Sequence, residues 1–180
     1  MRKNVKKQLA LRVLSTAALM AMVSSIATAA FAEKYDLNTG SVTVETKDNG
    51  TTYVTQENTD IKVRPDTTGV TITSGGTPTS NTITVDTAEN QTTNVTLENV
   101  YIKSESNSDS APIEIKGNGN TNLELNGDNI VLSGNSEHAG IEKADKYGHG
   151  TLTIKDEVND GGTGKLLAGG FSDGAGIGGG

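Results

Sequence analysis

The sequence predicts an all-β protein, a right-handed parallel β-helix of about five coils, and three observations support this prediction. Apolar–polar–apolar triplets recur at steps of 28, 25, 28 and 29 residues. Strand side chains alternate between two faces, so the outer residues of each triplet should point into one core. Segments rich in Gly and Asn, which suit sharp turns, separate the triplets. The triplets are Val42–Val44, Val70–Ile72, Val95–Leu97, Leu123–Leu125 and Leu152–Ile154.

Two further elements recur between the triplets, which predicts coils with three sides. The middle residues of the triplets would then stack into an outer column of Thr43, Thr71, Thr96, Glu124 and Thr153. The second element is an apolar pair, seen at Ile83 and Val85, Val100 and Ile102, Ile130–Leu132, and Leu166 and Leu167. The third is an Ala-x-Ile motif, seen at Ala111–Ile113, Ala139–Ile141 and Ala175–Ile177.

An antiparallel β-sandwich is the alternative fold, because it also consists of short alternating strands separated by turns. A sandwich does not explain why similar elements recur in the same order. In a β-helix each coil is stable only when a neighbouring coil covers its apolar side chains.

The first 32 residues have the features of a secretory signal peptide. Five basic residues precede an apolar run over Val13–Val23, and Ala30-Phe31-Ala32 resembles a cleavage site. Cleavage after Ala32 would leave a mature β-helix domain over residues 33–180. Export and the absence of cysteine from the sequence suit a bacterial secreted or cell-surface protein.

The mature chain would be strongly acidic. The leader holds 5 of the 15 basic residues and none of the 22 acidic ones, which leaves a net charge of −12. This charge excludes nucleic acid as a partner, because phosphates require a basic surface. No further membrane span is expected in the mature chain.

The last residues resemble a group of bacterial secreted surface proteins with β-helical repeats, the carbohydrate-binding domain-containing proteins. The resemblance rests on Thr151-Leu152-Thr153-Ile154 and on the G-A-G-I-G-G-G motif at Gly174–Gly180, and it is strongest over about Asn118–Gly180. It implies extracellular polysaccharide binding or adhesion, without catalytic residues. We expect the C-terminal coil to be truncated or uncapped, so that further repeats, another chain or self-association covers its strand edges.

Acidic turns are candidate calcium sites, because Asp, Glu and Asn oxygens are natural calcium ligands. The candidate metal residues are Asp128, Asp156, Glu157 and Asp160. Turn formation alone also explains these residues. Zinc binding by His138 and His149 is less favoured, since no third ligand is in register with them.

Glycan contacts are expected from hydrogen-bonding side chains that include Lys103, Lys116 and Lys155. Aromatic stacking has little support, since Tyr101 and Tyr147 are the only aromatic residues of the central coils. The sequence therefore predicts a non-enzymatic polysaccharide-binding or adhesive module, with calcium as its candidate cofactor. The alternatives are the N-terminal part of a β-helical polysaccharide lyase or hydrolase, and a passive structural stalk.

Overall fold

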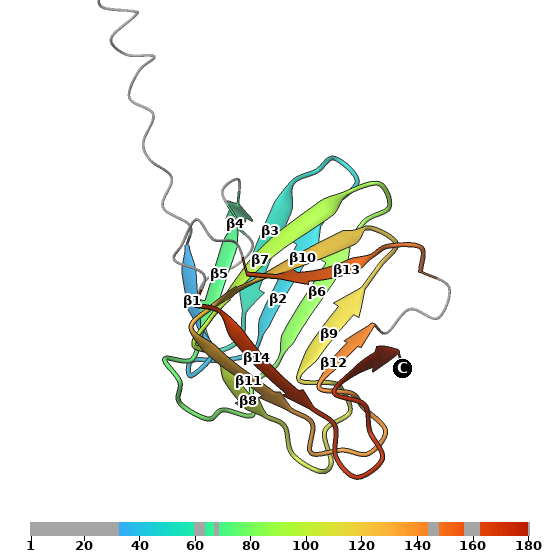
Figure 1. Cartoon of the computed structure of the whole chain (residues 1–180). Helices are drawn as coiled ribbons and strands as arrows, with labels where there is room; N and C mark the ends of the chain where they lie inside the picture. Colours follow the sequence, from blue (N-terminus) through green and yellow to red (C-terminus); the bar gives the residue numbers. More distant parts are fainter. Residues whose placement is uncertain (1–32, 60–63, 67–68, 144–147, 157–162, 180) are drawn as a thin grey trace, which may run out of the picture. The chain divides into compact units, whose positions relative to one another are not determined.

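The computed structural model describes residues 33–59, 64–66, 69–143, 148–156 and 163–179, all within a unit that spans Ala32–Gly180. Every regular element of these residues is a β-strand, and the strands form three sheets (Figure 1). The predicted all-β class is thus confirmed. In this part of the chain no helix has the length and apolar character needed to cross a bilayer.

Sheet A consists of five parallel strands and contains four of the predicted triplets. Val70 lies opposite Val95, and Val95 lies opposite Leu123, as the repeat predicts. The last triplet is shifted by two residues, because Ile154 rather than Leu152 lies opposite Leu123. In spatial order the strands are β1 (Lys34–Asp36), β5 (Val70–Thr73), β7 (Thr92–Glu98), β10 (Asn120–Asn126) and β13 (Leu152–Lys155).

Sheet B contains the first triplet, so the prediction that it stacks on Val70 is wrong. Val42 lies opposite Ile83 instead, and Tyr35 occupies the place in sheet A beside Ile72. In spatial order the strands are β15 (Ile177–Gly179), β12 (Ile141–Lys143), β9 (Ile113–Lys116), β6 (Ile83–Thr87), β2 (Val42–Thr46), β3 (Thr52–Gln56) and β4 (Arg64–Asp66).

A hairpin explains why the N-terminal part departs from the repeat. Gly50 has φ of 77° and donates its N–H to the carbonyl of Lys47, which reverses the chain between β2 and β3. Asn-Gly is a strong hairpin signal, since these residues tolerate positive φ. The pairs β2–β3 and β3–β4 are therefore antiparallel, whereas every other described strand pair is parallel. An antiparallel sandwich is not observed.

Sheet C and the end of sheet B contain the second and third predicted elements. Ile102, Val131 and Ala168 lie side by side in sheet C, and Ile113, Ile141 and Ile177 lie side by side in sheet B. The Ala-x-Ile motif thus recurs in register. Ile83 and Val85 belong with this third element, because Ile83 lies opposite Ile113. The strands of sheet C are β14 (Lys165–Gly169), β11 (Asp128–Leu132) and β8 (Tyr101–Lys103).

From β7 onward the chain visits sheets A, C and B in that order three times. An isolated parallel bridge from Thr79 to Ile102 extends this order back to the connection between β5 and β6. Sequence-adjacent strands therefore lie in different sheets, and the neighbours within one sheet come from successive repeats (Figure 1).

The predicted outer threonine column is present only in part. Thr71 lies opposite Thr96, but Glu124 and Lys155 continue this row. Thr43 lies in sheet B, and the shift of β13 moves Thr153 beside Asn122. The outer face of sheet A is therefore partly charged rather than a flat array of hydroxyl groups.

The inward side chains of the three sheets form one core. Ile72, Leu97, Ile113 and Leu123 are each 0% exposed. Burying each such side chain contributes about 1.5–3 kcal/mol relative to exposure. Branched aliphatic residues supply nearly all of this core, together with Tyr35.

A row of buried threonines lies among the inward residues at the ends of sheets A and B. The Thr93 hydroxyl is 2.6 Å from that of Thr46 and 2.7 Å from that of Thr87, and the Thr87 hydroxyl is 3.3 Å from that of Thr121. All four residues are at most 2% exposed. A hydroxyl can both donate and accept, so each threonine of the row has at least one hydrogen-bond partner away from water.

Replacing Thr93 with Val should lower the free energy of unfolding by about 1–3 kcal/mol, because it removes two buried hydrogen bonds and keeps the side-chain shape. Urea denaturation followed by circular dichroism measures this change. Thr96→Val is the matched control on the outer face of the same strand, where a change within about 0.5 kcal/mol is expected. Equal losses at both positions would contradict a role for the buried row.

Candidate functional site

A groove of about 800 Å³ lies where the chain leaves sheet C. The strands β8, β11 and β14 end in register, with Leu132 opposite both Lys103 and Gly169. The turns that follow these strands are therefore neighbours, and together they form the walls. The lining residues are Ser80, Lys103–Asn107, Leu132–Gly134, Gly170 and Phe171.

The groove combines hydrogen-bonding groups with one exposed aromatic ring. Ser80, Ser106 and Asn107 are exposed, and they offer hydroxyl and amide groups to a ligand. Phe171 is 55% exposed, and it is one of the few large apolar side chains that the described residues place on the surface. An aromatic face beside polar groups suits a ligand that has both apolar and hydroxyl-bearing faces.

Two opposite charges also line the groove. Lys103 is exposed, and among the described lysines it is the only one whose ammonium group contacts no carboxylate or carbonyl oxygen of the described residues. Glu105 is exposed in the adjacent turn and likewise forms no ion pair within the described part. Both groups are therefore available to a ligand.

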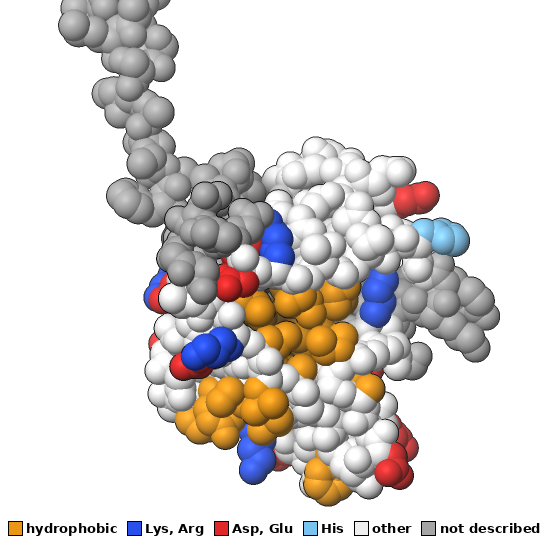
Figure 2. All heavy atoms as spheres, viewed as in Figure 1, with side chains coloured by type: hydrophobic (Ala, Val, Ile, Leu, Met, Phe, Trp, Pro, Cys, Tyr) orange, Lys and Arg blue, Asp and Glu red, His pale blue; other side chains and the backbone are white. Residues whose placement is uncertain are grey.

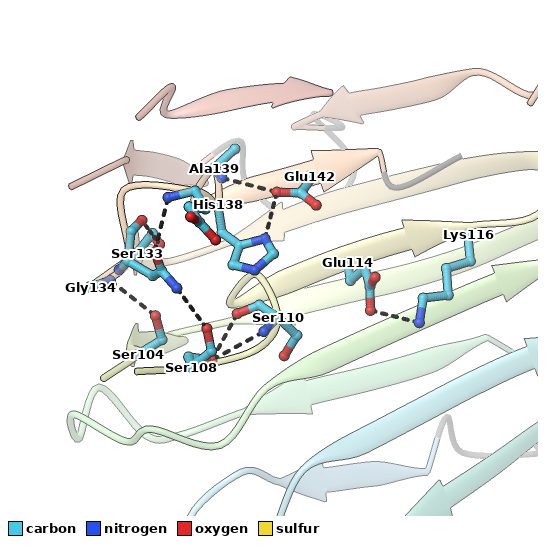
Figure 3. Close-up of polar contacts among 12 residues, drawn as sticks. Ser104, Ser108, Ser110, Glu114, Lys116, Ser133, Gly134, His138, Ala139 and Glu142 are labelled. Carbon is cyan, nitrogen blue, oxygen red and sulfur yellow. Dashed lines mark hydrogen bonds and ion pairs between the residues drawn. The ribbon is translucent and has the colours of Figure 1, made fainter. Parts of the chain in front are cut away.

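The floor of the groove is held by side chains whose polar atoms are used internally (Figure 3). Ser104 is 4% exposed, and its Oγ accepts a hydrogen bond of 3.0 Å from the N–H of Gly134. Ser133 is 6% exposed, and its Oγ donates to the carbonyl of Asn135 at 2.9 Å. Asn135 in turn donates its side-chain amide to the carbonyl of Ser108 at 2.9 Å. These bonds fix successive turns against one another.

The turn between β11 and β12 is also fixed by a buried carboxylate, which belongs to β12. Glu142 is 5% exposed, and its Oε2 accepts a hydrogen bond of 3.2 Å from the N–H of Ala139. The same oxygen lies 3.1 Å from Nδ1 of His138 (Figure 3). His138, which the sequence left as a minor metal candidate, thus closes a turn by contacting a residue four positions away.

A second carboxylate lies beside Glu142 on sheet B. Glu114 is directly opposite Glu142 on the adjacent parallel strand, and its Oε2 forms an ion pair of 2.9 Å with Nζ of Lys116 (Figure 3). The lysine partly offsets the repulsion between two neighbouring carboxylates. Glu114 and Glu142 are each engaged by a different partner, and these contacts stabilise the sheet and the turn beside the groove.

The structure places the predicted metal residues in separate surroundings. The Asp128 side chain is 73% exposed, and its Oδ1 lies 3.3 Å from Nζ of Lys165. Asp156 is exposed directly after β13, whereas Glu157 and Asp160 lie outside the described residues. Within the described residues no three His, Cys, Asp or Glu side chains are grouped as metal ligands. Calcium binding at these four residues stays a prediction.

The turn that contains Asp128 has a structural explanation of its own. Asn129 is 1% exposed and accepts a hydrogen bond from the N–H of Val100 at 3.0 Å. Gly127 has φ of 67°, and a Cβ atom there would lie 2.2 Å from Oδ1 of Asn99. Only glycine fits this close approach, so the Asn and Gly residues of the segment form a corner between sheets A and C.

Of the residues expected to contact glycans, only Lys103 lines the groove. Lys116 pairs with Glu114, and Lys155 lies 3.5 Å from Glu124 on sheet A. Tyr101 is partly buried in β8, and Tyr147 lies outside the described residues. Sequence reasoning missed Phe171 and the serine-rich segment 104–110, whose Ser-Glu-Ser-Asn-Ser-Asp-Ser composition was the available signal.

His149 is separate from His138 in the fold. It is exposed in the segment that precedes β13, whereas His138 lies in the turn between β11 and β12.

Comparisons of the chain with protein-family models, curated proteins and solved structures found no match. The groove is therefore interpreted from its own chemistry.

Replacing Glu142 with Ala should lower the free energy of unfolding by about 1–3 kcal/mol, because it leaves the buried N–H of Ala139 without its acceptor. Urea denaturation measures the loss, and faster hydrogen exchange of the Ala139 amide would locate it. Glu137→Ala, an exposed carboxylate in the same turn, is the control. Unchanged exchange at Ala139 would contradict the proposed role of the Glu142 carboxylate.

Proposed function

We propose that this chain is a secreted or cell-surface, non-enzymatic module that binds polysaccharide in the groove beside Phe171. The observation on which this depends is the combination of an exposed ring, exposed hydroxyl and amide groups, and an exposed lysine within one open groove. Sugars present an apolar face of C–H groups and a rim of hydroxyl groups, and this lining is complementary to both.

The finer fold assignment belongs to the same proposal. The recurring order of sheets A, C and B and the parallel register within each sheet favour a right-handed parallel β-helix. Parallel strands joined through crossovers are nearly always right-handed. In such a solenoid the turns at one corner form a continuous row, which is the arrangement that a linear polymer needs.

The charges of the groove and of the mature chain indicate which class of polysaccharide binds. The two charges of the groove, on Lys103 and Glu105, offset each other, whereas the mature chain has a predicted net charge of −12. Neutral polysaccharides avoid repulsion from this acidic surface. Uronate-containing polymers would need a divalent cation to bridge their carboxylates to those of the protein. We propose calcium for this bridging role.

The proposed extracellular location depends on the predicted signal peptide of the first 32 residues. The basic start, the apolar run over Val13–Val23 and Ala30-Phe31-Ala32 favour export and cleavage after Ala32. An extracellular location gives the chain access to polysaccharides.

Protein exported from the full-length gene should be depleted from solution by at least one insoluble neutral polysaccharide. Phe171→Ala should weaken that binding about tenfold, since loss of stacking and apolar contact is worth about 1.4 kcal/mol. Ile177→Ala is the control, because Ile177 is 50% exposed on the same repeat but does not line the groove. Equal binding by both variants would remove the groove from the proposal.

The lysine provides an independent test of the same groove. Lys103→Gln should weaken binding about fivefold, because a hydrogen bond from a charged donor contributes about 1 kcal/mol more than one from a neutral donor. Lys47→Gln, whose ammonium group pairs with Glu45 on sheet B, should leave affinity unchanged. No depletion of the unmodified protein by any polymer would refute glycan binding altogether.

Calcium assistance is tested with uronate polymers in calcium and again in EDTA. We expect depletion only in calcium, and a weaker calcium response in Asp128→Asn and Asp156→Asn. Binding that is identical in EDTA would remove calcium from the proposal and leave neutral glycan binding untouched.

A further inference from the structure

The two charged residues of the groove leave the chain on the same side. Lys103 and Glu105 are both exposed, whereas Ser104 between them is 4% exposed, so the alternation of a strand continues past the end of β8. The N–H of Ser104 still donates to the carbonyl of Leu132 at 3.0 Å, which extends the ladder of sheet C. The ammonium group and the carboxylate therefore project together into the groove.

Lys103 and Glu105 belong to an interior repeat of the described fold. On one side β8 is paired with β11, and on the other side Ile102 forms a parallel bridge with Thr79. The N–H of Lys103 donates to the carbonyl of Thr79 at 2.8 Å. The exposure of both side chains therefore does not depend on the last strand of the sheet.

The next repeat leaves open space beside the carboxylate. Leu132 lies opposite Lys103, and Gly134 follows Leu132 at the same interval at which Glu105 follows Lys103. Gly134 lies against Glu105, because a Cβ atom there would be 2.9 Å from the carbonyl carbon of Glu105. The groove thus has an apolar side chain next to the lysine and no side chain next to the carboxylate.

This pair of charges is complementary to a neutral amide group. An ammonium group can only donate hydrogen bonds, and an ionised carboxylate can only accept them. The C=O and N–H of an amide point in opposite directions, with the oxygen and nitrogen about 2.2 Å apart. With a hydrogen bond of about 2.9 Å at each end, the two charged groups would be about 8 Å apart. Alternate residues of a strand have Cα atoms about 6.6–6.8 Å apart, so Lys103 and Glu105 can bracket one amide.

Ligand groups with a net charge fit the pair less well. A uronate carboxylate would be attracted by Lys103 and repelled by Glu105, and a protonated amine would experience the reverse. Figure 2 shows the side of the molecule on which Figure 1 shows β14, and among its coloured residues lysine and acidic side chains are interspersed with uncharged groups. The surface around sheet C is therefore mixed in charge, as the groove is.

We propose that the polysaccharide is a polymer of N-acetylated amino sugars, and that Lys103 and Glu105 bracket its acetamido group. This inference rests on the proposed glycan-binding function of the groove. The ammonium group of Lys103 donates to the acetamido C=O, and the acetamido N–H donates to the carboxylate of Glu105. In a trans amide the methyl group lies on the side of the N–H, so it occupies the space over Gly134 and contacts Leu132.

Chitin, cellulose and chitosan test this assignment, because they share one β-1,4-linked backbone and carry an acetamido, a hydroxyl or an amino group at C2. The exported protein should bind chitin about tenfold more tightly than cellulose, since only the acetamido group engages both charges. Chitosan should bind no better than cellulose in salt that screens its attraction to the acidic chain. Titration with soluble oligosaccharides of the chitin and cellulose series removes differences between particle surfaces.

The outcomes separate this inference from the proposed function. Equal or tighter binding to cellulose would overturn acetamido recognition and leave polysaccharide binding in place. Binding to other polymers but to none of these three would do the same. Failure of every polymer to bind would refute both.

Glu105→Ala tests the carboxylate that distinguishes the two polymers. This variant should bind chitin and cellulose within about twofold of each other, because it removes the acceptor of the acetamido N–H. Its affinity for cellulose should be unchanged. Asp109→Ala is the matched control, since Asp109 is an exposed carboxylate of the same serine-rich segment that does not line the groove. A chitin preference that survives in Glu105→Ala would reject the assignment.

The double variant of Lys103→Ala and Glu105→Ala tests whether both residues contact one group. Residues that bind the two ends of a single amide should be coupled, so the double variant should lose less affinity for chitin than the product of the two single losses. The coupling should vanish with cellulose. Losses that multiply on chitin would show that the two side chains contact separate groups and would overturn the bracketing.

Discussion

The constraint on which the fold depends is parallel, in-register stacking of successive repeats. Strands in a sheet lie about 4.8 Å apart, so each repeat must place its strand one strand spacing from the equivalent strand of the repeat before it. Only then does Ile113 meet Ile141, and Ile141 meet Ile177, at the same inward position. A displacement by one residue would turn every core side chain toward water. The burial of all other groups, including the threonine row and Glu142, follows from keeping this register.

Polar side chains at the corners maintain the register where apolar packing cannot. Apolar contacts are non-directional, and a shift by two residues keeps the same face inward, as the displaced β13 shows with Ile154 opposite Leu123. Hydrogen bonds are directional and tolerate no such shift. Asn129 links the carbonyls of Gly127 and Lys165 to the N–H of Val100 and so joins three successive repeats. Buried amides and hydroxyls therefore specify which residues meet, while the aliphatic core supplies most of the stability.

The sequence predicted which faces are apolar better than it predicted which strands are neighbours. The Ala-x-Ile motif was identified correctly because both its residue types and its spacing recur. Val42–Val44 was misplaced because alternation defines a buried face but does not identify the sheet, and the hairpin at Gly50 moved this strand to sheet B. Phe171 was overlooked because a single aromatic residue among glycines has no periodicity. Its position beside Ser104–Asn107 arises only when turns more than sixty residues apart are stacked.

The location of the groove follows from how the sheets use their outer faces. On sheets A and B, outward charges contact each other, as Lys155 does with Glu124 and Lys116 with Glu114. Such pairs leave few groups for a ligand. Turn residues are under less constraint, because their backbone needs only to link strands in register and their side chains point away from the core. Glu105 and Phe171 occupy such positions beside sheet C, and Lys103, the last residue of β8, lies next to them. The rigid stack below holds three separate turns in fixed relation, and an open groove of adjacent turns is the part of this fold best able to vary its chemistry without losing stability.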